Sequence, residues 1–130
     1  MPTGFTATKV FVTEKNGVLV TALAAPSTEE DDFYLMLQYK DLHDELDVRF
    51  GMDKPYIEYC GQGWSRYGRI ERFDLFRDRV IVEMDSSAAL HMKNDGILEV
   101  RFELQQPAFV ELKQAIERTF RNVSYFVAMV

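Results

Sequence analysis

Carboxylates are the commonest ionisable side chains in this sequence, and they could serve as acids, bases or charged contacts. The 130 residues include 21 aspartates and glutamates against 15 lysines and arginines, which gives a net charge of −6. Glu58 and Glu71 are one conceivable acid and base pair, but outward alternation along strands explains both of them equally well. The acidic cluster at 29–32 is typical of a solvated loop, and the one at 41–47 is expected to be a loop or one turn of helix. These patterns assign no catalytic residue.

Cysteine and histidine provide neither a clear nucleophile nor a metal site. Cys60 is the single cysteine, and His43 and His91 lie in separate segments. Nothing in the sequence links a histidine to the thiol, and a lone cysteine at a strand end is most often a small buried hydrophobic residue. The 41–47 cluster lacks the glycine and the closing glutamate of a calcium loop. We therefore predict no metal and no cofactor.

The loop after Cys60 holds the side chains best suited to contact a partner. Its glycines do not form a phosphate loop, because a strand and not a helix follows them. Trp64 and Tyr67 are large aromatics at a loop tip, where they either anchor a partner or fold back on the edge of the core. The arginines between residues 66 and 79 alternate with acids, which favours cross-strand pairing over a phosphate site. The predicted partner-binding residues are Asp44, Glu45, Asp47, Gln62, Trp64, Arg66 and Tyr67.

Length and composition predict a single domain spanning residues 1–130. Hydrophobic residues make up 47% of the chain and aromatic residues 13%, which is enough for a packed core. The acidic balance argues against binding to nucleic acid or to an anionic membrane, because both require positive charge. No stretch approaches the roughly 18 apolar residues of a membrane span, and the first residues do not resemble a signal peptide. We expect a cytoplasmic protein whose acidity serves solubility or a basic partner.

Hydrophobic periodicity predicts the strands that must position these side chains. Asn16 and Gly17 separate β-rich runs at 5–12 and 18–23, which is typical of a hairpin. Residues 33–40 alternate between an apolar face and a second face that is not fully polar, as in a strand covered partly on both sides. The remaining predicted strands are 56–60, 70–76 and 80–84, interpreted as an antiparallel meander, and 97–104, where the alternation is cleanest.

The C-terminal part is predicted to form one long helix. Pro107 suits the first helical position, and the helix should extend to about Arg121. Apolar residues recur on one side of it at Phe109, Leu112, Ile116 and Phe120, so this side should pack on the sheet. The apolar tail 125–130 should add a strand or pack on the sheet. The predicted fold is α+β, with an antiparallel sheet of six to eight strands and one long C-terminal helix packed on it.

Several short motifs occur in an order that resembles a known family. They are Tyr34-Leu35-Met36-Leu37-Gln38, Asp44-Glu45-Leu46-Asp47, Gly51-Met52-Asp53, Gln62 and Ser65-Arg66-Tyr67-Gly68-Arg69-Ile70-Glu71, followed by Asp85 and the helix at 109–120. Over residues 5–121 this pattern resembles the immunity protein 10 family of bacterial polymorphic-toxin systems. The chain departs from it at Arg69, where a second glycine is usual, and in its apolar tail.

The resemblance implies a small cytoplasmic protein that binds and blocks a toxin made by its own or a sibling cell, without catalytic residues or a cofactor. An acidic surface is compatible with this, because carboxylates can imitate a nucleic-acid backbone in front of a basic nuclease. One alternative is a small enzyme or ligand-binding domain with a pocket between sheet and helix, using Glu58, Glu71 or Tyr67. Another is an acidic secretion chaperone, which would bind an unfolded effector segment.

Overall fold

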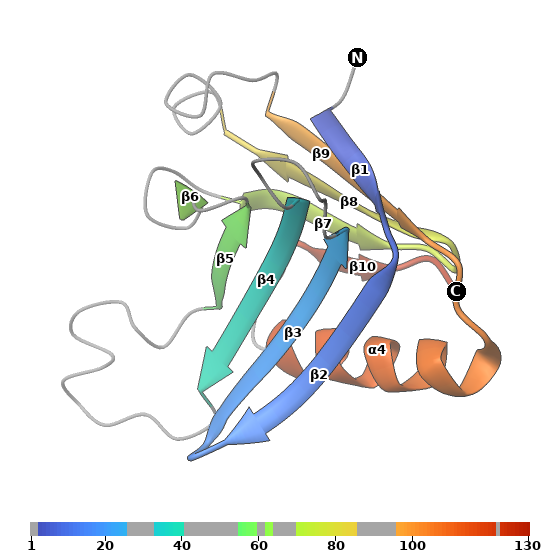
Figure 1. Cartoon of the computed structure of the whole chain (residues 1–130). Coiled ribbons are helices and arrows are strands. Elements are labelled where there is room, and N and C mark those ends of the chain that lie inside the picture. Colours follow the sequence, from blue (N-terminus) through green and yellow to red (C-terminus); the bar gives the residue numbers. More distant parts are fainter. Residues whose placement is uncertain are drawn as a thin grey trace, which may run out of the picture.

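The computed structural model describes residues 3–25, 33–40, 55–59, 62–63, 70–85, 96–121 and 123–130. These residues form ten strands and one helix, arranged as two five-stranded sheets and a helix packed on them (Figure 1). The elements are β1 (Thr3–Ala7), β2 (Lys9–Lys15), β3 (Val18–Ala25), β4 (Phe33–Lys40), β5 (Tyr56–Tyr59), β6 (Gln62–Gly63), β7 (Ile70–Leu75), β8 (Arg79–Met84), β9 (Ile97–Phe102), α4 (Gln106–Thr119) and β10 (Phe126–Ala128). The α+β class and the C-terminal helix are confirmed.

The strands are divided between two sheets, where the sequence predicted one antiparallel sheet of six to eight strands. The first, here called the antiparallel sheet, has the order β2-β3-β4-β5-β6. The second, here called the mixed sheet, has the order β1-β9-β8-β7-β10, and its edge strands β1 and β10 run parallel to their neighbours. Alternation identifies a strand but not its partner, because pairing depends on residues far apart in the sequence.

The predicted meander is split between these two sheets. β5 pairs with β4 and β6 in the antiparallel sheet, whereas β7 and β8 pair with each other in the mixed sheet. The meander is therefore wrong for its first strand and confirmed for the other two. β9 continues it by pairing antiparallel with β8.

β1 and β2 form a nearly continuous stretch that is shared between the sheets. At the junction, the amide of Thr8 donates a hydrogen bond to the carbonyl oxygen of Ala24 at 2.8 Å. Within β1, Gly4 lies so close to β9 that a Cβ atom there would be 1.9 Å from the carbonyl oxygen of Glu99. Glycine at this position therefore permits the parallel pairing of β1 with β9.

The hairpin between β2 and β3 is the one predicted from Asn16 and Gly17. Both residues have positive φ angles, 55° and 78°, as a two-residue type I′ turn requires. Lys15 and Val18 pair directly on either side of the turn. The prediction is confirmed together with its physical reason.

The core is formed by the facing sides of the two sheets and by α4. β4 contributes Leu35 and Leu37, and β9 contributes Leu98 and Val100, all fully buried. The helix packs against β2, β3 and β4 (Figure 1). Its predicted apolar stripe is confirmed, because the four side chains are at most 4% exposed, namely Phe109, Leu112, Ile116 and Phe120.

The two ends of α4 are formed in different ways. The chain is extended at Gln105 and the helix begins at Gln106, so Pro107 is its second residue, one place after the predicted first position. In the last turn, Arg118 forms an ion pair with Glu14 of β2. The hydrogen bond from Arg118 lowers the pKa of the Glu14 carboxyl group, so the contact favours the charged form that joins helix and sheet.

The apolar tail adds a strand, as predicted. β10 lies parallel to β7, with the amide of Phe73 donating to the carbonyl oxygen of Tyr125 at 3.0 Å and the amide of Met129 donating to that of Leu75 at 2.7 Å. Phe126 stacks on Phe120 with ring centroids 5.6 Å apart. The tail therefore contributes to the same core as the helix.

The phenol of Tyr125 should make stability fall at high pH. Burial raises its pKa from 10.0 to about 12, because the charged phenolate is poorly solvated there. Between these two values the unfolded chain loses this proton while the folded chain keeps it, so the free energy of unfolding decreases as pH rises. Urea unfolding measured at pH 9 to 12 should show a shallower decrease for Tyr125→Phe than for the wild type. Equal slopes would contradict this assignment.

A buried hydroxyl group on β3 should cost stability. Thr21 is fully buried, and its Oγ1 atom has no hydrogen-bond partner among the described residues. Thr21→Val removes the unsatisfied group at nearly constant volume, so the free energy of unfolding should rise by about 1–2 kcal/mol. The control is Thr13→Val on β2, where the hydroxyl is exposed and the change should stay within about 0.5 kcal/mol. A Thr21→Val protein that unfolds at lower urea than the wild type would show that the hydroxyl is satisfied.

Candidate functional site

The predicted partner-binding residues fall mostly outside the described part of the chain. Gln62 lies in the edge strand β6 of the antiparallel sheet, where it pairs with Tyr59. The other six lie outside the described residues, namely Asp44, Glu45, Asp47, Trp64, Arg66 and Tyr67. Their role in binding therefore stays a prediction.

The register of the antiparallel sheet nevertheless constrains where these segments depart. Gln62 pairs with Tyr59, and Tyr59 pairs with Leu35, so β6 lies near the beginning of β4. Lys40, which precedes residues 41–54 in the sequence, is the last residue of β4, and β5 begins near that end because Tyr56 pairs with Gln38. Gly63, which precedes Trp64, pairs with Glu58 and is therefore level with Met36, four residues or about 14 Å from Lys40 along the strand. The described residues next to the Asp41 to Asp47 cluster and next to the aromatic loop are thus offset along the sheet.

The face of the antiparallel sheet that points away from α4 carries a compact polar group. Tyr34 on β4 and Tyr56 on β5 donate hydrogen bonds from their hydroxyl groups to Oε2 and Oε1 of Glu58, at 2.5 Å and 2.8 Å. All three side chains are half-buried. Two phenols therefore fix the orientation of one carboxylate. This group was not predicted from the sequence, although the incompletely polar second face of residues 33–40 was a signal for it.

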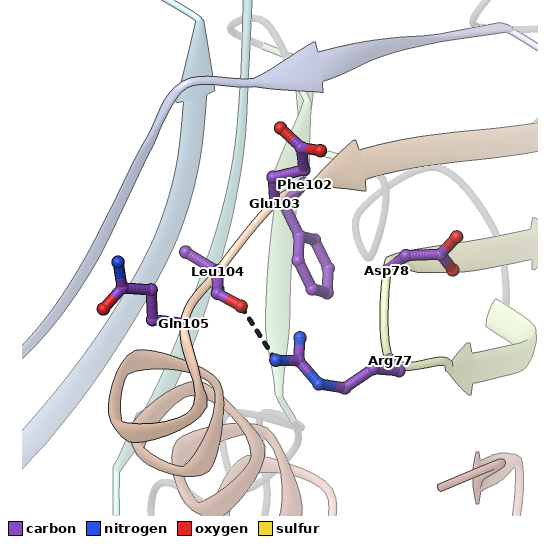
Figure 2. A pocket seen from close by; sticks show the side chains of 6 residues that line it. All are labelled: Arg77, Asp78, Phe102, Glu103, Leu104 and Gln105. Atoms are coloured by element: carbon purple, nitrogen blue, oxygen red, sulfur yellow. Dashed lines mark hydrogen bonds between the residues drawn. The ribbon is translucent and has the colours of Figure 1, made fainter.

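One hollow in the described surface lies where β9 leads into α4 (Figure 2). It has a volume of about 340 Å³. The guanidinium of Arg77 donates to the carbonyl oxygen of Leu104 at 2.8 Å and lies 4.4 Å from the centre of the Phe109 ring. Asp78, which also lines this hollow, accepts a hydrogen bond from Arg79. Arg77 therefore joins the turn between β7 and β8 to the connection between β9 and α4.

A second hollow, of about 370 Å³, lies between α4 and the β2–β3 hairpin. The Glu14 and Arg118 ion pair lines it. Among the residues described here, no three histidine, cysteine or carboxylate side chains are grouped as metal ligands.

The alternative of a ligand pocket between sheet and helix finds little support. Glu58 belongs to the face opposite α4, Glu71 is exposed on β7, and Tyr67 lies outside the described residues. Where that pocket was expected, the described interface is filled by four buried side chains, Phe102, Phe109, Ile116 and Phe120. Glu58 and Glu71 therefore do not form one site with the helix.

Comparison with known proteins identifies a family. Residues 6–110 match the family model described as Immunity protein 10. The matched range includes the last two residues of β1, the strands from β2 to β9 and the first residues of α4. Comparison with curated proteins and with solved structures gave no match. No helix in the described ranges is long and apolar enough to cross a membrane.

Proposed function

Because this chain belongs to the immunity protein 10 family, we propose that it neutralises a cognate bacterial toxin domain by direct protein-protein contact. The observation that carries this proposal is the family match over residues 6–110, most of the two-sheet scaffold. In this role the protein needs no reaction of its own, and it acts by covering the toxin surface. Its place of action is the cytoplasm of the cell that must be protected.

The charge of the chain supports a basic partner, such as a nuclease. A net charge of −6 attracts a basic protein over long range and accelerates encounter. The contacts proposed for this step are the carboxylates Asp44, Glu45 and Asp47. Gln62, Trp64, Arg66 and Tyr67 are proposed to form the contacts that hold the complex once it has formed.

Co-expression tests this function. Each toxin-like domain encoded beside the gene for this chain is expressed in a bacterial host with the chain or with an unrelated acidic protein of similar size. We expect this chain to restore the growth of cells that express one of these domains, here called the cognate toxin, and to co-purify with it. The unrelated protein should do neither. If the chain restores growth against none of these domains and none is recovered in pull-downs, the proposed function is wrong.

A further inference from the structure

The outer face of the antiparallel sheet, meaning the face that points away from α4, has an unusual composition for a solvated surface. Across the four longest strands of this sheet, the register aligns Phe11, Ala22, Met36 and Glu58 in one row. Phe11 is 51% exposed, and Ala22 and Met36 are half-buried. The solvated face of an antiparallel sheet is ordinarily polar. This row instead offers apolar contacts beside a carboxylate, which is a combination that suits an interaction surface.

The described elements leave this face uncovered. α4 and the mixed sheet both lie on the other side of β2, β3 and β4 (Figure 1). The neighbouring row contains Val20, Gln38 and Tyr56 in register, and all three are half-buried. Ala22 on β3 lies beside Met36 on β4, and Met36 lies beside Glu58 on β5, so a partner that packs on this row reaches the carboxylate of Glu58.

Glu58 differs from the carboxylates on the outside of the mixed sheet. There, Asp74 pairs with Arg72 at 2.7 Å and Glu99 pairs with Arg101 at 2.8 Å. By contrast, no lysine or arginine of the described residues forms an ion pair with Glu58, which accepts two phenol hydroxyls instead. Each carboxylate oxygen has a second acceptor position, so the oriented group can still receive a cation.

The partner that fits this face is a folded protein with an arginine or lysine surrounded by apolar surface. Tyrosine, phenylalanine, methionine and arginine are all enriched at the centres of protein interfaces, and the residues that dominate binding on one partner tend to meet those of the other. A guanidinium can bind a fixed carboxylate through two hydrogen bonds. The rim carries Lys9 and Lys15, which are exposed at the two ends of β2, so the partner should present carboxylates around its central cation.

We propose that this outer face docks on the toxin and that Glu58 receives a cationic side chain of the toxin at the centre of the contact. This inference rests on the proposed function and adds the chemistry of the contact. Tyr34 and Tyr56 are positioning residues, because they hold the carboxylate in the orientation that the cation meets.

Affinity measurements with the cognate toxin test this proposal. The full chain is titrated into a catalytically inactivated form of the cognate toxin, and the dissociation constant is measured by calorimetry. Glu58→Gln keeps the shape and removes the charge, so it should weaken binding roughly tenfold or more. Met36→Lys places a charge within the apolar row and should weaken binding at least as much. Glu83→Gln, on the exposed outer side of the mixed sheet, is the matched control and should bind like the wild type.

The outcomes separate this proposal from the proposed function. If the wild type binds and both face variants bind equally well, the docking face is wrong while toxin neutralisation stands. If the wild type binds no toxin, both are wrong. Urea unfolding shows whether each variant is folded, and should Glu58→Gln fail to fold, Met36→Lys decides between the two outcomes. Loss of affinity in Glu83→Gln equal to that in Glu58→Gln would also contradict the proposal, because it would indicate a general effect of charge.

Discussion

Replacing Phe120 with alanine is expected to lower the free energy of unfolding by about 3–5 kcal/mol. Phe120 is 1% exposed and follows the last turn of α4. Its ring centroid lies 4.5 Å from that of Phe73 on β7 and 5.8 Å from that of Tyr125 before β10. The substitution therefore leaves a cavity at the point where helix, mixed sheet and tail meet, and the three elements cannot all collapse into it.

Urea unfolding followed by circular dichroism measures this effect. Phe11→Ala is the control, because it removes the same ring from a position that is 51% exposed and should cost less than about 1 kcal/mol. Similar losses for the two variants would contradict the packing described for Phe120.

The largest expected effect on binding comes from Trp64. If its indole is an anchor, Trp64→Ala should cost about 2 kcal/mol or more of affinity, which corresponds to roughly thirtyfold. The loss should appear in the dissociation rate, because anchors determine how long a complex lasts. Surface plasmon resonance with the inactivated cognate toxin measures that rate. A stable, folded Trp64→Ala protein that dissociates at the wild-type rate would place the anchor elsewhere.

Neutralising Asp44, Glu45 and Asp47 together should have the opposite kinetic signature. Charges at the rim act mainly on encounter, so the Asn/Gln triple variant should associate more slowly at low salt and dissociate at nearly the wild-type rate. Raising the salt concentration should reduce the difference, because long-range attraction is screened. An association rate that is unchanged at low ionic strength would show that this cluster does not steer the partner.

Local signals in the sequence predicted the elements that depend on neighbouring residues. Asn16 and Gly17 determine their own turn, the alternation at 33–40 matches β4, and Pro107 with the apolar stripe predicts α4. The division into two sheets was not predicted, because it depends on long-range pairing such as that of β1 with β9. Gly4 gives no sign in the sequence that a neighbouring strand approaches it closely.

The candidate site shows the same limit. Glu58 was recognised as a carboxylate of interest, but its two phenol partners could not be identified from the sequence. Their convergence requires Gln38 to pair with Tyr56 and Met36 to pair with Glu58, and a shift of one residue would place Glu58 in the core. Trp64 and the acidic cluster at 41–47 were selected by residue type alone, so they await the binding measurements.

The most direct test of whether this chain acts by contact is to titrate the purified protein into a fixed concentration of the active cognate toxin. Toxin activity is measured at each ratio, with toxin concentration well above the dissociation constant. Inhibition by contact predicts that activity falls linearly and reaches its minimum at a fixed molar ratio, which stays the same after longer incubation. If far fewer than one protein chain per toxin molecule is enough for inhibition, and the inhibition increases with time, each chain must inactivate many toxin molecules in turn. That result would contradict a neutraliser that works by covering the toxin surface.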